Sequence, residues 1–144
     1  MTMATTQQPR PTEHPGYAET LPRRAATVQT ARSLVRAAVT AWGMGHLAAA
    51  AELVMSELVT NAVLHASGPL LRVIVERPAD DRVLIAVVDR APDRMPQLRT
   101  PDLDDATGRG LLLVNDAAYQ WGCDVLGPPL RPWGKRVWAE FDTH

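Results

Sequence analysis

The segment from Glu52 to His65 constrains this chain most, because it is a long apolar run interrupted by polar side chains at helical spacing. At about 100° per residue, Glu57, Asn61 and His65 fall within roughly 80° of one another on one side of a helix. The opposite side is apolar and consists of Ala51, Met55, Leu58, Val59, Ala62, Val63 and Ala66. The run therefore predicts a helix that is buried over most of its girth and keeps one polar stripe.

The chemistry of this stripe allows two interpretations. Carboxamide and carboxylate oxygens suit a hard cation such as Mg²⁺, and a carboxylate can also accept the proton of an attacking hydroxyl. The plain alternative is the solvent-facing side of an amphipathic helix, which the spacing by itself favours. The choice between them depends on the rest of the chain.

Composition narrows the class of protein. A length of 144 residues suits one domain, and a hydrophobic fraction of 46% is ordinary for a globular one. The net charge of −1 gives no basic footprint for nucleic acid or an anionic membrane. Cys123 is the single cysteine, so neither an internal disulfide nor a zinc-ligand pattern exists. We therefore expect a cytoplasmic setting.

Residues 1–16 contain mostly Thr, Gln and Pro, with almost nothing to bury. They predict a disordered N-terminal tail before a single domain at 17–144. They also lack the apolar stretch of a signal peptide, and no run of 18 or more apolar residues predicts a spanning helix.

Periodicity predicts helices first and strands afterwards. Helical spacing indicates helices at about 24–42 and 47–66, with Gly43 and Gly45 placed to end the first. Alternation indicates an antiparallel hairpin of strands 70–76 and 82–89 around a turn at 78–81. Further on, the sequence predicts a long loop, a short helix and two strands, at 90–109, 111–118, 119–126 and 135–141. This order is typical of an α+β two-layer sandwich, with helices on one face of a mostly antiparallel mixed sheet.

Asp89 ends the apolar strand Val83–Asp89. A carboxylate at such a place is desolvated enough to accept a strong, directional hydrogen bond, for instance from the exocyclic amine of a base. The plain alternative is a strand-end residue that starts a turn.

The third candidate is the glycine-rich segment Thr107-Gly108-Arg109-Gly110-Leu111, which a helix follows at once. Glycines let backbone N–H groups approach an anion closely, and a helix N-terminus adds a favourable dipole. The Arg109 side chain could add charge to phosphate oxygens. The alternative is a flexible turn or a helix cap.

Taken in order, these three features resemble the GHKL family of ATPases and kinases, which have the Bergerat ATP-binding fold. The similarity is closest to its small bacterial anti-sigma-factor serine/threonine kinases and related actinobacterial regulators, and it spans about 17–141. The matching lines are Ser56-Glu-Leu-Val-Thr-Asn-Ala-Val-Leu-His-Ala66, Val87-Val-Asp-Arg-Ala-Pro92, Gly108-Arg-Gly-Leu-Leu-Leu-Val114, Trp121-Gly122 and Gly134-Lys-Arg-Val-Trp138.

The resemblance implies a role for each candidate. Asn61 matches the asparagine that coordinates Mg²⁺, and Glu57 matches the presumed general base of the kinase members. Asp89 matches the aspartate that binds the adenine amino group, and His65 is expected to line the same pocket. The lid over the phosphates matches Thr107, Gly108, Arg109, Gly110 and Leu111. Cys123, Trp42, Trp121 and Trp138 are predicted to pack inside the domain.

One departure concerns the positions two and four residues after Asp89. Family members with a full adenine motif place glycines there, whereas this chain has Ala91 and Asp93. Because glycine permits close backbone approach, the two Cβ atoms bear on ATP affinity and turnover.

The resemblance implies an ATP- and Mg²⁺-binding regulator that acts as an anti-sigma factor and as a serine/threonine kinase. Its partners would be a sigma factor, an anti-sigma-factor antagonist and a second copy of itself, without nucleic acid or membrane. The departure at 91 and 93 favours an alternative, a catalytically inactive protein-interaction module in a transcriptional switch.

Overall fold

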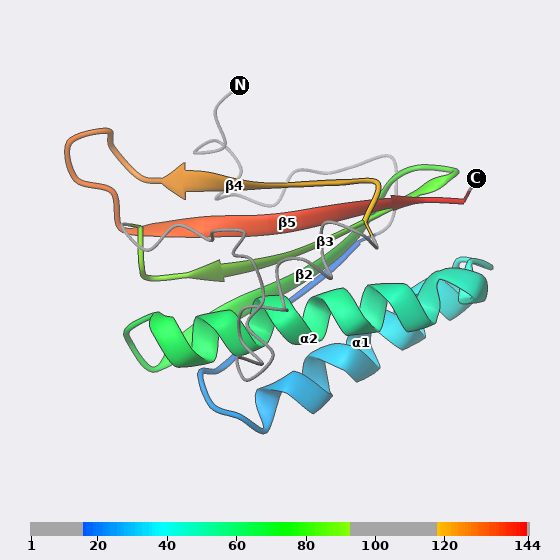
Figure 1. Cartoon of the computed structure of the whole chain (residues 1–144), viewed down its shortest axis with the longest axis horizontal. Helices are drawn as coiled ribbons and strands as arrows, with labels where there is room; N and C mark the ends of the chain where they lie inside the picture. The colour runs from blue at the N-terminus through cyan, green and yellow to red at the C-terminus, as the bar shows by residue number, and fades with distance from the viewer. Residues whose placement is uncertain (1–15, 93–117, 144) are drawn as a thin grey trace, which may run out of the picture.

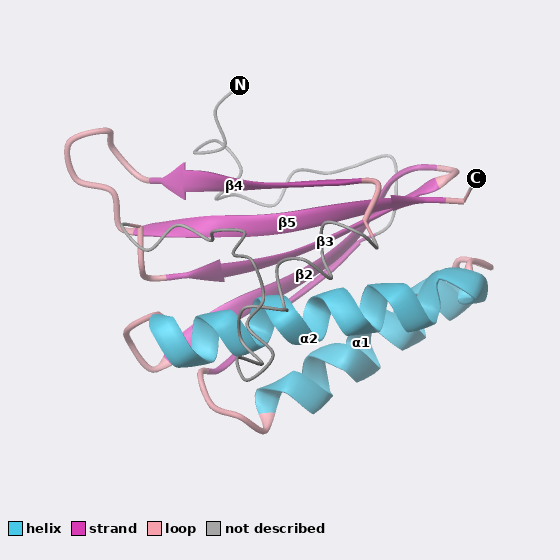
Figure 2. Ribbon diagram, in the orientation of Figure 1, coloured by secondary structure: helices cyan, strands magenta, loops and turns pink. Residues whose placement is uncertain are grey.

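The computed structural model describes residues 16–92 and 118–143. In chain order the elements are β1 (Gly16–Pro22), α1 (Thr27–Ala41), the 3-10 turn η2 (Gly45–Leu47), α2 (Ala48–His65), β2 (Leu70–Ala79), β3 (Arg82–Asp89), β4 (Gln120–Leu126) and β5 (Gly134–Asp142). The strands form one sheet in the order β1-β2-β3-β5-β4, and every neighbouring pair in it is antiparallel. Both helices cover one face of this sheet (Figure 1, Figure 2). The predicted α+β two-layer class is confirmed.

Local patterns predicted the elements well and their ends less well. The 82–89 strand has the predicted bounds, and its antiparallel pairing with β2 is confirmed. The first helix begins at Thr27 rather than at 24, because residues 24–26 form a turn in which the Thr27 N–H donates to the Arg24 carbonyl. The predicted 90–109 loop and 111–118 helix lie almost wholly outside the described residues.

Glycine ends α1 as predicted. Gly43 has a φ of +74°, the left-handed conformation that glycine adopts without steric cost. The N–H of Gly43 donates to Thr40, and the N–H of Met44 donates to Val39. These two bonds form a Schellman motif, which satisfies carbonyls at the helix end and places Met44 in the core.

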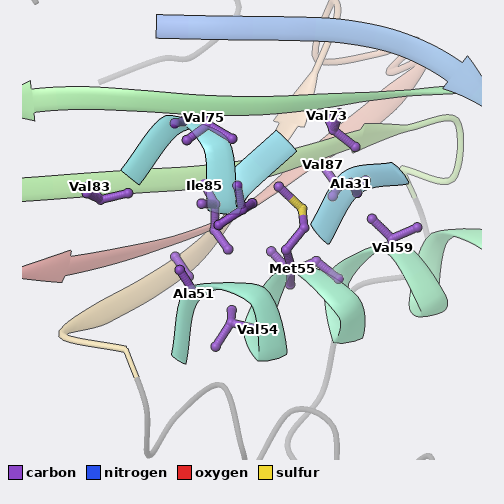
Figure 3. Close-up of a cluster of buried hydrophobic side chains, with 14 of the residues drawn as sticks. Ala31, Ala51, Val54, Met55, Val59, Val73, Val75, Val83, Ile85 and Val87 are labelled. Atoms are coloured by element: carbon purple, nitrogen blue, oxygen red, sulfur yellow. The ribbon is translucent and has the colours of Figure 1, made fainter. Parts of the chain in front are cut away.

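The core lies between α2 and the middle of the sheet. Alternate residues of β3 point toward the helices, and Val83, Ile85 and Val87 are almost fully buried there. Met55 of α2 extends into the same cluster (Figure 3). Burying a side chain of this size contributes about 1.5–3 kcal/mol, so the facing rows of α2 and β3 stabilise the two-layer arrangement strongly.

Helix α2 is unusually apolar for a helix that also carries two glutamates. The segment Gly45–His65 is 21 residues long with a mean hydropathy of 1.5, which matches a spanning helix in length and composition. One side of it packs into the core, however, through Ala51, Val54, Met55, Leu58, Val59 and Ala62. Burial against the sheet and α1 accounts for this side, whereas Leu53 and Leu64 of the same helix are exposed.

Three of the four residues predicted to pack inside the domain do so. Trp42, Trp121 and Cys123 pack against the core cluster. The prediction for Trp138 is wrong: Val137 and Ala139 take the core-facing positions of β5, so Trp138 points to the other face of the sheet. There its indole covers Gly122, where an added Cβ would lie 2.7 Å from the ring.

Gly134→Ala tests the close approach of β5 to the end of β3. A Cβ at this position would overlap the Asp89 carbonyl oxygen, so the two strands must separate. We expect a loss of about 1–3 kcal/mol in the free energy of unfolding, measured with urea. Gly45→Ala is the control, since nothing lies within 4 Å of its added Cβ. An equal effect of both substitutions would contradict the assigned strand contact.

Candidate functional site

The C-terminal end of α2 and the C-terminal end of β3 lie at the same end of the molecule (Figure 1). A hydrogen bond joins the segments that follow them, in which the Ser67 hydroxyl donates to the Arg90 carbonyl over 2.8 Å. The last turn of the helix that carries the polar stripe and the end of the strand that carries Asp89 are thereby brought together.

Arg23, which follows β1, holds the end of α2 in place. Its Nε donates to the Gly68 carbonyl at 2.6 Å, and its Nη1 donates to the Val63 carbonyl at 2.7 Å. The last carbonyls of a helix have no partner within the helix, so a guanidinium is a favourable cap for them. Arg23 therefore fixes the last turn of the helix that carries the polar stripe.

The exposure of the polar stripe of α2 increases toward the C-terminal end of the helix. Glu57 and Asn61 are half-buried one turn apart, whereas His65, the last residue of the helix, is exposed. Burial raises the pKa of the Glu57 carboxyl above its usual value of 4.5. Within 16–92 and 118–143, no hydrogen bond or ion pair engages the side chains of Glu57 and Asn61. They are thus available to a ligand as far as this part of the chain is concerned.

Asp89 lies on the core-facing side at the end of β3, and only 4% of its side chain is exposed. Its Oδ1 accepts from the Lys135 ammonium at 2.8 Å and from the Ala91 N–H at 3.0 Å. Lys135 also donates to the Ala91 carbonyl at 3.0 Å, and 7% of its side chain is exposed. The strand-end carboxylate is therefore part of a buried salt bridge that also holds the turn after β3.

Lys135 is the site residue that the sequence reasoning missed. Its pairing with Asp89 follows from the register of β3 and β5, in which the two residues are direct partners. A signal was present in the sequence, because residues 135, 137, 139 and 141 alternate onto the core face and a lysine is rarely buried without a partner. Two distant strands must pair before that partner can be identified.

Ala91 shows how the turn after Asp89 accommodates a side chain. The residue is buried, and in the described chain no residue other than glycine has a positive φ. Its backbone N–H and carbonyl are both bonded to the Asp89–Lys135 pair. Asp93, the second position that departs from the family pattern, lies outside the described residues.

Cys123 lies near this salt bridge but is not suited to nucleophilic chemistry. Burial raises the pKa of its thiol to about 11, an effect that Asp124 and Asp89 reinforce and the Lys135 charge opposes. Because the thiolate is the reactive form, a thiol with this pKa is inert near neutral pH.

A second buried carboxylate of α2 faces α1 rather than the site. Glu52 accepts from Arg36 at 2.8 Å, and Arg32 lies 3.7 Å from its other oxygen. Arg32 also donates to the Ser56 hydroxyl at 3.2 Å. Glu52 therefore joins the two helices, and it is the natural comparison for Glu57, five residues later on the same helix.

The predicted lid, Thr107 to Leu111, lies outside the described residues, and so do its contacts. Among the described residues no group of three or more His, Cys, Asp and Glu side chains could hold a metal ion. The available donors are the hard oxygens of Asn61 and Glu57. This set fits Mg²⁺, which usually takes one or two protein ligands and completes its shell with water and phosphate oxygens.

The two helices on one face of a five-stranded antiparallel sheet define the class of the protein as a two-layer α+β domain. The sequence profile of the histidine kinase-like ATPase domain matches residues 21–121, which is more than half of the chain. The chain belongs to this family and is therefore an ATP-binding domain of the kinase-like class. A search of curated proteins gives no match.

Glu57→Gln and Glu52→Gln, made on the same helix, should change stability in opposite directions at neutral pH. The raised pKa means that ionised Glu57 opposes folding once the pH exceeds its unfolded-state value, so Gln should stabilise, by at most about 0.5 kcal/mol after screening by water. Glu52→Gln removes a salt bridge and should destabilise.

Urea unfolding between about pH 4 and pH 8 provides the measurement. The gain from Glu57→Gln should shrink toward the acid end, where protonation increasingly removes the charge of Glu57 in both the folded and the unfolded state. A gain independent of pH would show that the burial of charge is not its cause.

Proposed function

We propose that this ATP-binding domain is a Mg²⁺-dependent regulator that acts as an anti-sigma factor and as a serine/threonine kinase toward an anti-sigma-factor antagonist. The observation that carries the kinase part is the half-buried Glu57, which lies one turn from Asn61 and has no partner among the described residues. Membership of the histidine kinase-like ATPase family supports the nucleotide part.

The chemistry assigned to this site is mainly that of positioning. The Glu57 carboxylate would accept the proton of the serine hydroxyl, and its raised pKa makes it a stronger base than an exposed glutamate. The Asn61 side-chain oxygen would hold Mg²⁺, which supplies charge neutralisation at the phosphate oxygens. Backbone N–H groups of Thr107 to Leu111 are the proposed donors to the transferred phosphoryl group.

Calorimetric titration of the full chain with Mg·ATP tests whether the proposed site binds nucleotide. We expect Asn61→Ala to weaken binding about tenfold or more, because it removes a ligand of the metal–phosphate unit. Glu52→Gln, which changes a side chain directed at α1, should leave the affinity unaltered. Equal losses in both variants would show that general destabilisation, not a lost ligand, weakens binding.

Transfer of label from γ-labelled ATP to a purified antagonist protein tests the kinase part. Labelling should fall by a factor of about 100 or more in Glu57→Ala and Glu57→Gln, because both lack the base. Glu52→Gln should retain labelling at temperatures where it is folded. Undiminished transfer in Glu57→Ala would remove Glu57 from the proposed role.

The alternative function is a protein-interaction module that does not turn nucleotide over. It is favoured by Ala91, a buried side chain where the family pattern has glycine. Mg·ATP titration separates the two, since a module of this kind should show no binding at millimolar nucleotide. The proposed setting is the cytoplasm, with a sigma factor, the antagonist and a second copy as partners, and co-purification from the native cell would identify them.

A further inference from the structure

We propose that Lys135 is a positioning residue for nucleotide recognition, which holds the Asp89 carboxylate so that one oxygen is directed to the exocyclic amine of the base. This inference rests on the proposed function, together with the contact between Asp89 and the adenine amino group that the family resemblance implies. It gives a role to Lys135 of β5, which lies outside the motifs on α2 and at the end of β3.

The two carboxylate oxygens of Asp89 differ in their hydrogen bonds. Both hydrogen bonds that the described residues make to this carboxylate fall on Oδ1, one from Lys135 and one from Ala91. No described residue bonds to Oδ2, and we assign this atom to the base. A carboxylate with one oxygen held by two donors cannot rotate freely, so the direction of Oδ2 is set before a ligand arrives.

Lys135 does more than pair with the charge of Asp89. Its ammonium donates to Oδ1 of Asp89 and to the carbonyl of Ala91, which lie on either side of Arg90 in the turn after β3. It therefore braces the turn at a position where the family pattern has a flexible glycine. An ammonium has three N–H donors, and two of them are used here.

A carboxylate that is fixed in direction, as Asp89 is here, binds best to a base that offers it a hydrogen-bond donor. The 6-amino group of adenine is such a donor, whereas a purine with hydrogen at carbon 6 offers none. A site built to accept this hydrogen bond should reject the analogue, because the buried oxygen is left unpaired. Discrimination between the two nucleotides thus reports how well Asp89 is positioned.

The test compares the affinities of the full chain for Mg·ATP and for the Mg²⁺ complex of purine riboside triphosphate, which lacks the 6-amino group. We expect wild type to prefer ATP about tenfold or more, as for a hydrogen bond to a charged group. In Lys135→Met the ratio should fall toward one, and in Asp89→Ala it should also be near one. In the Asp89→Ala/Lys135→Met double variant the ratio should match that of Asp89→Ala, because Lys135 acts through Asp89.

Two further variants separate positioning from loss of stability. Glu52→Gln disrupts a buried carboxylate salt bridge of the same length, 2.8 Å, away from the site, so it should destabilise and yet keep the ratio. Lys135→Gln keeps an N–H donor without the charge, and its ratio should lie between those of wild type and Lys135→Met. This variant also covers the case in which Lys135→Met does not fold.

The outcomes that overturn the inference are distinct from those that overturn the proposed function. A wild-type ratio that persists in Lys135→Met or Lys135→Gln, with a loss of stability like that of Glu52→Gln, would make Lys135 merely structural. A wild-type chain that binds ATP without preference would overturn the contact between Asp89 and the amine. A chain that binds neither nucleotide would overturn the proposed function itself.

Discussion

The burial of α2 on two sides is the constraint on which the rest of the structure depends. The helix packs against α1 and against β3, and Ala51, Val54, Met55 and Val59 are completely buried there. A polar residue on either buried side therefore needs a specific partner. Glu52 and Ser56 contact arginines of α1, whereas Glu57 and Asn61 are half-buried and have no such partner among the described residues.

Three carboxylates of this domain lie in different surroundings, which suit them to different roles. Glu52 is paired with arginine at a helix interface and holds two helices together. Asp89 is paired with Lys135 at a strand end, where pairing fixes its direction. Glu57 is half-buried without such a partner among the described residues, and burial raises its pKa. Glu57 is the one of the three that has no cationic partner in the described part of the chain, which suits it to accepting a proton.

Local patterns predicted much of the fold and pointed to candidate site residues on α2 and β3, but not to Lys135. The 82–89 strand, the glycine that ends α1 and the apolar side of α2 all follow from short-range periodicity and backbone conformation, which neighbouring residues determine. The misplacement of Trp138 has the same origin as the omission of Lys135. Both depend on which face of β5 meets the helices, and the partner of a buried lysine on that face is fixed only when β5 pairs with β3.

The sequence by itself determined the class of the fold and the candidate functional groups. Helix and strand periodicity and the order of the motifs depend only on the residues along the chain. Tertiary structure decided which of those groups act together. The register of β3 and β5 joined Asp89 to Lys135, and the packing of α1 on α2 neutralised Glu52 but not Glu57. Salt bridges and desolvation depend on distances of a few ångströms between segments far apart in sequence, and only the folded chain fixes those distances.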